Sequence, residues 1–330
     1  MVQPHVACRS VDHYHGVMTS PPFDAEGRFQ RPVAQLRNWI TPDGSAGPTG
    51  RAGYAAEAGR YHLYIAEGCP WCHRTWMFRV LKGLEDVVPM SMVTLAWGPK
   101  GWAFDDSSER YRDRLHGRAS VRDIYEADTP DYAGPVTVPV LWDDRTQTIV
   151  SNESADIIRM FNSAFNDVTG NSTDYYPAEL RAEIDEINER IYHRLNNAVY
   201  RAGFAQTQLA YEEAFDDVFD TLTFLEKHLA TRRYLCGERI TEADWRLFPT
   251  LVRFDVAYVG CFRCDLRRLI DYPNLWGYTR DLYQRPGIAQ TVLPHIYRLG
   301  YYSIPIAVGH GRIIPKGPVV DFATEHGRGS

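Results

Sequence analysis

Two cysteines at C-x-x-C spacing are the residues of this 330-residue chain whose types and spacing are best suited to chemistry. Cys69 and Cys72 lie in the segment GCPWCHRT, residues 68–75. A thiolate at the first position can attack a sulfur atom, and a second thiol three residues later can form or resolve a disulfide with it. Packed core cysteines and half of a zinc site are the alternatives. The motif has no well-spaced second pair, which favours the redox interpretation.

The flanking residues predict a strand, a turn and a helix around this motif. Residues 61–65 alternate in polarity and are rich in aromatic and β-branched types, which is typical of a strand. Residues 70–82 predict a helix, and Pro70 suits its first turn because the missing N–H has no partner there. We therefore expect Cys69 at a helix N-terminus, where free N–H groups and the helix dipole lower the pKa of a thiol. Cys69 would be the nucleophile and Cys72 the resolving thiol.

Composition and charge limit the classes of partner. Hydrophobic residues make up 44% of the chain and charged residues 24%, as in soluble globular proteins. The net charge of −6 gives no reason to expect nucleic acid or an anionic membrane as a partner. We find no signal peptide and no apolar run near the roughly 20 residues that span a bilayer. Six cysteines are too few for a disulfide framework, so we expect a cytoplasmic protein with reduced thiols.

The pattern along the chain predicts an α/β domain followed by an all-helical one. Segments 178–200 and 209–230 are long and amphipathic without internal Gly or Pro, and Thr241 with Asp244 resembles a capping box at a helix start. A shorter helix is predicted over 288–293. The expected organisation is an extended N-terminal arm (1–58), a thioredoxin-like thiol-binding domain (59–162), a linker (163–178), an all-helical domain (179–302) and a C-terminal tail (303–330).

Two features of the α/β domain are expected to face the cysteine motif. Pro139 lies in the predicted strand 137–143, where proline is awkward, and this predicts a cis peptide. In a thioredoxin-like fold a cis-proline lies opposite the redox cysteine, and the backbone of the preceding Val138 can pair with a peptide-like thiol. Glu153 and Ser154 open the next predicted helix and would hold the amino-acid end of such a ligand. Simple helix capping is the alternative for both residues.

Several stretches, in order, resemble the glutathionyl-hydroquinone reductases, also called Xi-class glutathione transferases. The resemblance spans residues 28–318. It is carried by GRYHLY (59–64), CPWCHRT (69–75), GWAF (101–104), TVPVLWD (137–143), TIVSNES (148–154), VYRAGFA (199–205), LCGERITEADWRLF (235–248) and DYPNLW (271–276).

The resemblance implies a glutathione transferase fold, a homodimer and a reaction at Cys69. Cys69 would attack the glutathione sulfur of a glutathionyl-hydroquinone, the hydroquinone would leave, and a second thiol would release glutathione from the mixed disulfide. No metal is implied. Without the resemblance, Arg122 is interpreted as a solvated charge and Trp102 as a core residue or loop anchor. The implied glutathione-binding residues are Trp102, Arg122, Val138, Pro139, Glu153 and Ser154, and the implied pocket for the aromatic substrate contains Tyr192, Tyr200, Tyr301 and Tyr302.

Departures from the family leave alternatives open. Most members have alanine where this chain has Cys72, so a dithiol disulfide reductase, using glutathione or mycothiol, is the second hypothesis. Pro135 and residues 303–310 also differ, which leaves the aromatic substrate open. A non-catalytic thiol-binding module is the third hypothesis, and the intact cysteine motif argues against it.

A second C-x-x-C motif and the histidines are weighed and set aside. Cys261 and Cys264 lie far along the chain between predicted helices, and a zinc site shared with the first motif would consume the redox centre, so we interpret them as packed free cysteines. The histidines lack ligand-like spacing and are expected at the surface or satisfied in the core. His73 adjoins the first motif and is expected to favour a thiolate there. The histidines considered are His73, His193, His228 and His295.

Overall fold

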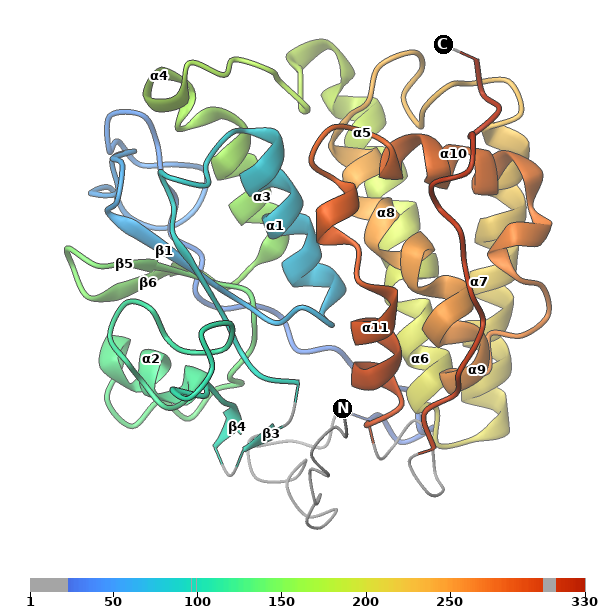
Figure 1. Ribbon diagram of the computed structural model, residues 1–330, viewed down its shortest axis with the longest axis horizontal. Helices are drawn as coiled ribbons and strands as arrows, with labels where there is room; N and C mark the ends of the chain where they lie inside the picture. The colour runs from blue at the N-terminus through green and yellow to red at the C-terminus, as the bar shows by residue number, and fades with distance from the viewer. Residues whose placement is uncertain (1–22, 96, 99, 305–312, 330) are drawn as a thin grey trace.

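The computed structural model describes residues 23–95, 97–98, 100–304 and 313–329. A mixed four-stranded sheet with its helices occupies one side of the molecule and a bundle of helices the other (Figure 1). The strands of this sheet are β1 (Tyr61–Ile65), β2 (Met90–Met92), β5 (Val140–Asp143) and β6 (Thr148–Ser151). Their order is β2-β1-β5-β6; β1 is parallel to β2, and β5 is antiparallel to both β1 and β6. A separate hairpin joins β3 (Trp97–Gly98) to β4 (Gly101–Trp102).

The sheet is covered by helices on both faces. All five residues of β1 are buried, as expected for a central strand packed on two sides. Helices α1 (Pro70–Leu81) and α3 (Ser154–Ser163) pack against each other on one face, and α2 (Val121–Asp128) lies on the other (Figure 1). α2 begins with a capping box, in which Ser120 and Asp123 satisfy each other's backbone N–H groups.

The second half of the chain forms the helical bundle. Asp244 accepts hydrogen bonds from the N–H (2.7 Å) and the hydroxyl (3.0 Å) of Thr241, so the predicted helix start is confirmed. The helix that begins there, α8 (Glu242–Arg253), packs against α1 and joins the bundle to the cysteine motif. The helices are α5 (Arg181–Ile191), α6 (Ala198–Phe204), α7 (Gln208–His228), α8 (Glu242–Arg253), α9 (Val259–Cys261), α10 (Pro273–Tyr283) and α11 (Pro294–Tyr301).

Local structure differs from the sequence-based prediction at three places. The predicted linker contains a short helix, α4 (Asn166–Thr169). The helix predicted over 178–200 is interrupted by a π turn at Tyr192–Asn196, which directs the Asn196 side chain toward Arg74 (2.9 Å) and Thr250 (2.8 Å). The helix predicted over 288–293 is a 3₁₀ turn, Ala289–Thr291, because Pro294 suits the first position of α11 and starts a new helix there.

Residues 23–58 run along both halves of the molecule. Asn38 donates its backbone N–H to Val150 at the end of the sheet (2.8 Å), so the segment extends the edge at β6. Near its start, the ring of Phe29 packs edge-on against Phe204 of α6, with centroids 5.1 Å apart. The segment therefore contacts the sheet and the helical bundle at once.

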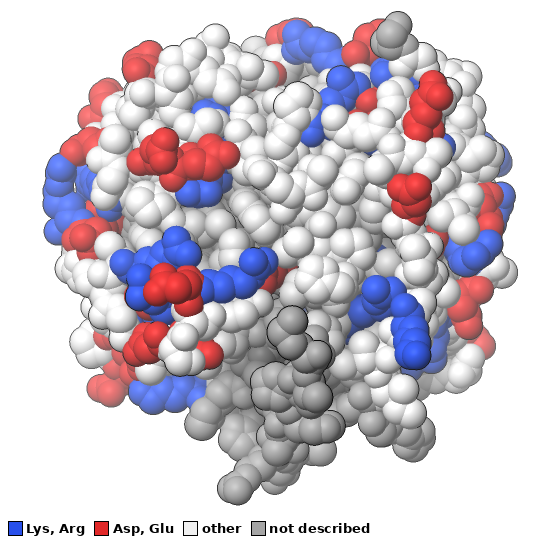
Figure 2. Space-filling view, in the orientation of Figure 1, with Lys and Arg blue, Asp and Glu red and all other residues white. Residues whose placement is uncertain are grey.

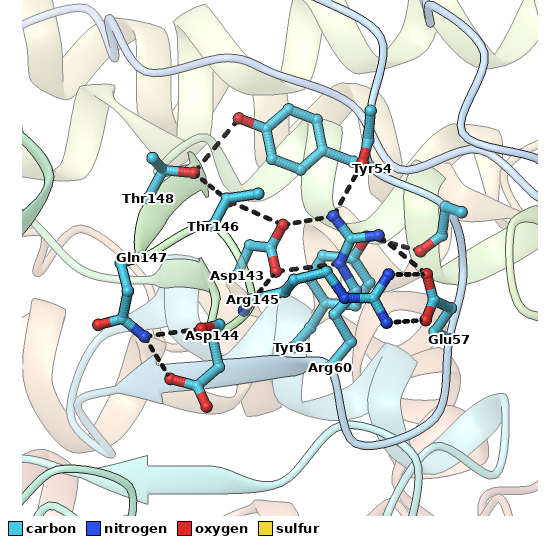
Figure 3. Close-up of polar contacts among 12 residues, drawn as sticks. Tyr54, Glu57, Arg60, Tyr61, Asp143, Asp144, Arg145, Thr146, Gln147 and Thr148 are labelled. Atoms are coloured by element: carbon cyan, nitrogen blue, oxygen red, sulfur yellow. Dashed lines mark hydrogen bonds and ion pairs between the residues drawn. The ribbon is translucent and has the colours of Figure 1, made fainter.

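A buried ion pair fixes the end of this segment to the sheet (Figure 3). Arg60 donates two hydrogen bonds to Asp143 (3.0 and 2.6 Å) and a third to the carbonyl oxygen of Gly53 (2.8 Å). Burial raises the pKa of Asp143, but the hydrogen bonds from Arg60 and Thr146 outweigh it and the pKa is lowered overall. Asp143 is thus held as a carboxylate at the end of β5.

Acidic and basic side chains are intermingled on the face of the molecule shown in Figure 2. Within the described ranges, no helix combines the length and the apolar character needed to cross a membrane.

Two arginines, Arg74 and Arg253, are among the largest fully buried side chains. These buried cations lie beside the cysteine motif.

Candidate active site

The strand–turn–helix predicted around the motif is present. β1 ends at Ile65, and Cys69 is the N-cap of α1 with an extended backbone. Pro70 occupies the first turn, and the carbonyl oxygen of Cys69 accepts the backbone N–H of His73 (3.0 Å). The Cys69 side chain therefore lies at the N-terminus of α1, where the backbone N–H groups are unpaired and the helix dipole has its positive end.

The two cysteines differ in exposure and in acidity. Cys69 is partly exposed, whereas Cys72 is fully buried and its sulfur accepts the N–H of Ala66 (3.3 Å). Burial raises the pKa of Cys69, but hydrogen bonds from the thiol and backbone of Cys72 and the charge of Arg253 together lower it to about 7. Burial and then the neighbouring Cys69 raise the pKa of Cys72 well above its ordinary value. Cys69 is thus the thiolate and Cys72 the thiol that donates to it.

Arg253, at the end of α8, is a buried cation aimed at the turn before Cys69. Its Nε donates to the carbonyl oxygen of Gly68 (3.1 Å) and its Nη2 to that of Glu67 (3.4 Å). No carboxylate in the described part of the chain forms an ion pair with it, so its charge is available to the Cys69 thiolate. Sequence reasoning missed this residue because it is about 180 positions from the motif.

His73 is neutral, and the expectation that it favours the thiolate is wrong. Burial, followed by the charge of Arg253, lowers the pKa of His73 well below its ordinary value. Arg253 donates to Nδ1 of the ring (3.0 Å), so Nε2 carries the proton and donates to the hydroxyl of Thr291 (2.8 Å). His73 therefore orients Arg253, and Arg253 supplies the positive charge.

The segment around Pro139 faces Cys69, as expected. The Val138–Pro139 peptide is cis, and the carbonyl oxygen of Val138 lies 3.8 Å from Sγ of Cys69. Tyr125 ties this segment to the start of α3, because its hydroxyl donates to Thr137 O (3.0 Å) and accepts from Asn152 (3.0 Å). The backbone that can pair with a peptide-like thiol is thereby held opposite the cysteine.

Glu153 and Ser154 cap α3. One carboxylate oxygen of Glu153 accepts the N–H of Ala155 (2.9 Å) and the hydroxyl of Ser154 (3.3 Å). This geometry matches the capping interpretation. The two residues follow Asn152, which is linked to Tyr125, by one and two positions.

Arg122 and Trp102 come from adjoining elements, since β4 packs against α2. Arg122 is not a solvated charge: its side chain is mostly buried, and it donates to the carbonyl oxygen of Tyr132 (3.3 Å) and lies 3.8 Å from Glu126. Trp102 is half-buried and packs against the core.

Three tyrosine hydroxyls meet in the helical bundle. The hydroxyl of Tyr301 lies 2.5 Å from that of Tyr200 and 3.1 Å from that of Tyr258. Burial raises the pKa of all three, so they remain protonated and able to donate. Tyr258 was missed by sequence reasoning, because nothing in its own segment distinguishes it from a core tyrosine.

The other two predicted tyrosines lie elsewhere. The ring of Tyr192, at the start of the π turn, is 5.9 Å from that of Trp71 in the cysteine motif. Tyr302 instead lies against Gly260, where an added Cβ would be 2.0 Å from its hydroxyl oxygen. The structure thus brings Tyr200 and Tyr301 together, places Tyr192 beside the motif and directs the Tyr302 hydroxyl to Gly260 instead of to the cluster.

Cys261 and Cys264 are buried free cysteines. The Cys261 thiol donates to the carbonyl oxygen of Tyr301 (3.3 Å). In the described parts of the chain, no group of three or more His, Cys, Asp or Glu residues could hold a metal ion.

The candidate site around Cys69 therefore consists of a thiolate, the buried cation of Arg253, the carbonyl of Val138 and protonated phenols nearby. This arrangement suits nucleophilic attack on sulfur.

Comparison with known proteins finds matches along most of the chain. The family model described as "Glutathione S-transferase, N-terminal domain" matches residues 68–164, and "Glutathione S-transferase, C-terminal domain" matches residues 208–281. Glutathionyl-hydroquinone reductase YqjG of Escherichia coli is 49% identical over 92% of this chain and 92% of its own.

Solved structures extend the comparison to the fold. The glutathione-bound structure of YqjG superposes with a TM-score of 0.86 at 49% identity, covering 89% of this chain and 96% of the other. The Xi transferase of Phanerochaete chrysosporium gives a TM-score of 0.84 at 44% identity, covering 90% and 95%. The predicted fold, a thioredoxin-like α/β domain followed by an all-α domain, is confirmed. The chain belongs to the glutathione transferase family and, within it, to the Xi-class glutathionyl-hydroquinone reductases.

Proposed function

We propose that this protein is a glutathione-dependent reductase that cleaves glutathionyl-hydroquinone conjugates through Cys69. The observation that carries the proposal is the position of Cys69, at the start of α1, with its pKa lowered to about 7. A partly exposed thiolate at neutral pH is the nucleophile that such a reaction requires. The relative that is 49% identical along almost the whole chain is a glutathionyl-hydroquinone reductase.

The reaction balances in two steps. The Cys69 thiolate attacks the sulfur of the conjugate, the sulfur–carbon bond breaks, and the aromatic carbon takes up a proton as the hydroquinone leaves. Cys69 then carries glutathione in a mixed disulfide. A second glutathione thiolate attacks that disulfide and restores Cys69, so glutathione is oxidised and the aromatic ring is reduced. The proton for the ring carbon would come from the hydroxyl cluster of Tyr200, Tyr258 and Tyr301, which burial keeps protonated.

We assign the glutathione half of the substrate to the sheet side of the site. The backbone of Val138, next to Pro139, would pair with the cysteine of the tripeptide, since its carbonyl already faces Cys69. Glu153 and Ser154 would hold its amino-acid end, and Arg122 with Trp102 would contact a carboxylate. Homodimer formation and a cytoplasmic location are further parts of the proposal, and they depend on the family resemblance and the composition.

A dithiol route is the second candidate, because the Cys72 thiol lies within hydrogen-bond reach of Cys69. Cys72 would attack the mixed disulfide and leave a Cys69–Cys72 disulfide, with glutathione or mycothiol as the external thiol. Full burial and a raised pKa make Cys72 a poor nucleophile. The geometry therefore favours attack by external glutathione.

Mass spectrometry of the intact protein after one turnover tests the proposal. Wild type, Cys72→Ala and Cys69→Ala are each mixed with S-glutathionyl-hydroquinone. Wild type and Cys72→Ala should release hydroquinone and carry one glutathione, whereas Cys69→Ala should do neither. A disulfide between Cys69 and Cys72 in wild type would establish the dithiol route. No release with glutathione or mycothiol would refute the reductase and support a thiol-binding module.

A further inference from the structure

Arg31 brings a guanidinium from the N-terminal segment to the cysteine motif and the tyrosine cluster. Its Cζ lies 5.0 Å from the ring centre of Trp71, between the two motif cysteines, and 4.6 Å from that of Tyr200. Its Nε donates to the side-chain oxygen of Asn197, just after the π turn (2.7 Å). One cation thus touches both halves of the candidate site.

One nitrogen of the Arg31 guanidinium has no hydrogen-bond acceptor within the described residues. Its Nη2 is shielded from solvent and makes no hydrogen bond within the described residues. No described carboxylate forms an ion pair with it, whereas Arg28 and Arg37 on the same segment each donate two hydrogen bonds to a carboxylate, on Glu213 and Asp156 respectively. A buried charged donor without an acceptor is costly, and binding of an anionic oxygen would relieve that cost.

We propose that Arg31 is a specificity-determining residue that binds an anionic oxygen on the aromatic half of the substrate. The inference rests on the proposed function and extends it. Arg31 lies over the rings of Trp71 and Tyr200, so an oxygen bound at its Nη2 would lie beside these aromatic side chains. A phenolate oxygen or a ring carboxylate at Nη2 would form the charge-assisted hydrogen bond that the protein itself leaves open.

The electrostatics of Tyr200 support this placement. Burial raises the pKa of Tyr200 most, a Cys69 thiolate raises it further, and Arg31 acts in the opposite direction. Tyr200 therefore lies within electrostatic range of both the nucleophile and Arg31. An aromatic ring seated beside Tyr200 would be exposed to the same two charges.

Binding of sulfur-free ring compounds tests the inference independently of turnover. The probes are hydroquinone, 2,5-dihydroxybenzoate and 1,4-dimethoxybenzene, titrated by calorimetry into wild type, Arg31→Met, Arg31→Lys and the control Arg28→Gln. Arg28 lies on the same segment and pairs with Glu213, so its replacement loosens the segment without touching the site.

We expect Arg31→Met to weaken 2,5-dihydroxybenzoate about tenfold or more and hydroquinone a few-fold, with dimethoxybenzene unchanged. Arg31→Lys should recover part of the loss, and Arg28→Gln should match wild type. The difference in affinity loss between 2,5-dihydroxybenzoate and hydroquinone measures the contribution of the carboxylate apart from that of the phenolic oxygens. Equal weakening of all three probes would mean that Arg31 only anchors the segment, and a change in none would overturn the inference. Glutathione is titrated as a fourth ligand; if Arg31→Met weakened glutathione and none of the ring compounds, Nη2 would be assigned to the tripeptide and the inference would be overturned. Failure of turnover in wild type would refute the proposed function without affecting these binding results.

Discussion

Replacing Cys72 by alanine should make Cys69 less acidic. The hydrogen bond from the Cys72 thiol is the largest influence that lowers the pKa of Cys69 against burial. A hydrogen bond to a charged group contributes about 1.5–3 kcal/mol, and a weak S–H donor belongs at the low end. A loss of about 1.4 kcal/mol corresponds to a rise of about one pKa unit. The pKa of Cys69 should therefore move from about 7 to about 8.

The pH dependence of alkylation by iodoacetamide measures this change. The midpoint of the rate profile should rise in Cys72→Ala, while the rate at high pH should increase, because a more basic thiolate is more nucleophilic. These effects partly cancel at pH 7, where the rate should fall only about twofold. Cys69→Ala gives the background from other thiols, and Cys72→Ser, which keeps a donor, should return the midpoint toward wild type. An unchanged or lower midpoint in Cys72→Ala would refute the reasoning.

Three further predictions concern the cation, the ion pair and the phenols. Arg253→Met should raise the pKa of Cys69 and lower Tm, because the Glu67 and Gly68 carbonyls lose their donor; Arg253→Lys should restore the alkylation profile more than Tm. Asp143→Asn should cost about 1.5–3 kcal/mol in urea unfolding, because Arg60 keeps only the more exposed carboxylate of Glu57, while the surface control Asp144→Asn costs little. Since the native pKa of Asp143 is lowered, its contribution is present above pH 4 and lost as pH falls further, and Asp143→Asn should flatten that dependence. Tyr301→Phe should lower kcat about tenfold or more with little change in KM, and an unchanged kcat would remove the cluster from the reaction.

Local sequence chemistry predicted the elements that hold Cys69. The alternating residues 61–65, Pro70 at a helix start and an awkward proline at position 139 each have one good structural solution. The strand, the helix and the cis peptide were therefore predictable without any knowledge of distant contacts. The Thr241 capping box was predictable for the same reason.

The charges and phenols around Cys69 were not predictable in this way. Arg31, Arg253 and Tyr258 reach the site from segments far from the motif, and their own neighbours carry no signal of that contact. His73 shows the converse: proximity in sequence suggested a cation, but burial beside Arg253 keeps the ring neutral. What a buried group does depends on the tertiary contacts around it.

The π turn at Tyr192–Asn196 sets the rotational phase between α5 and α6. Each residue of an α-helix advances the side-chain direction by about 100°, so deleting one residue from this turn would rotate everything after it by about that angle. Asn197 would then face away from Arg31 and Tyr200 away from Tyr301, although α5 upstream would keep its packing. The one extra residue in this π turn thus brings the N-terminal segment and the phenol cluster to the same place.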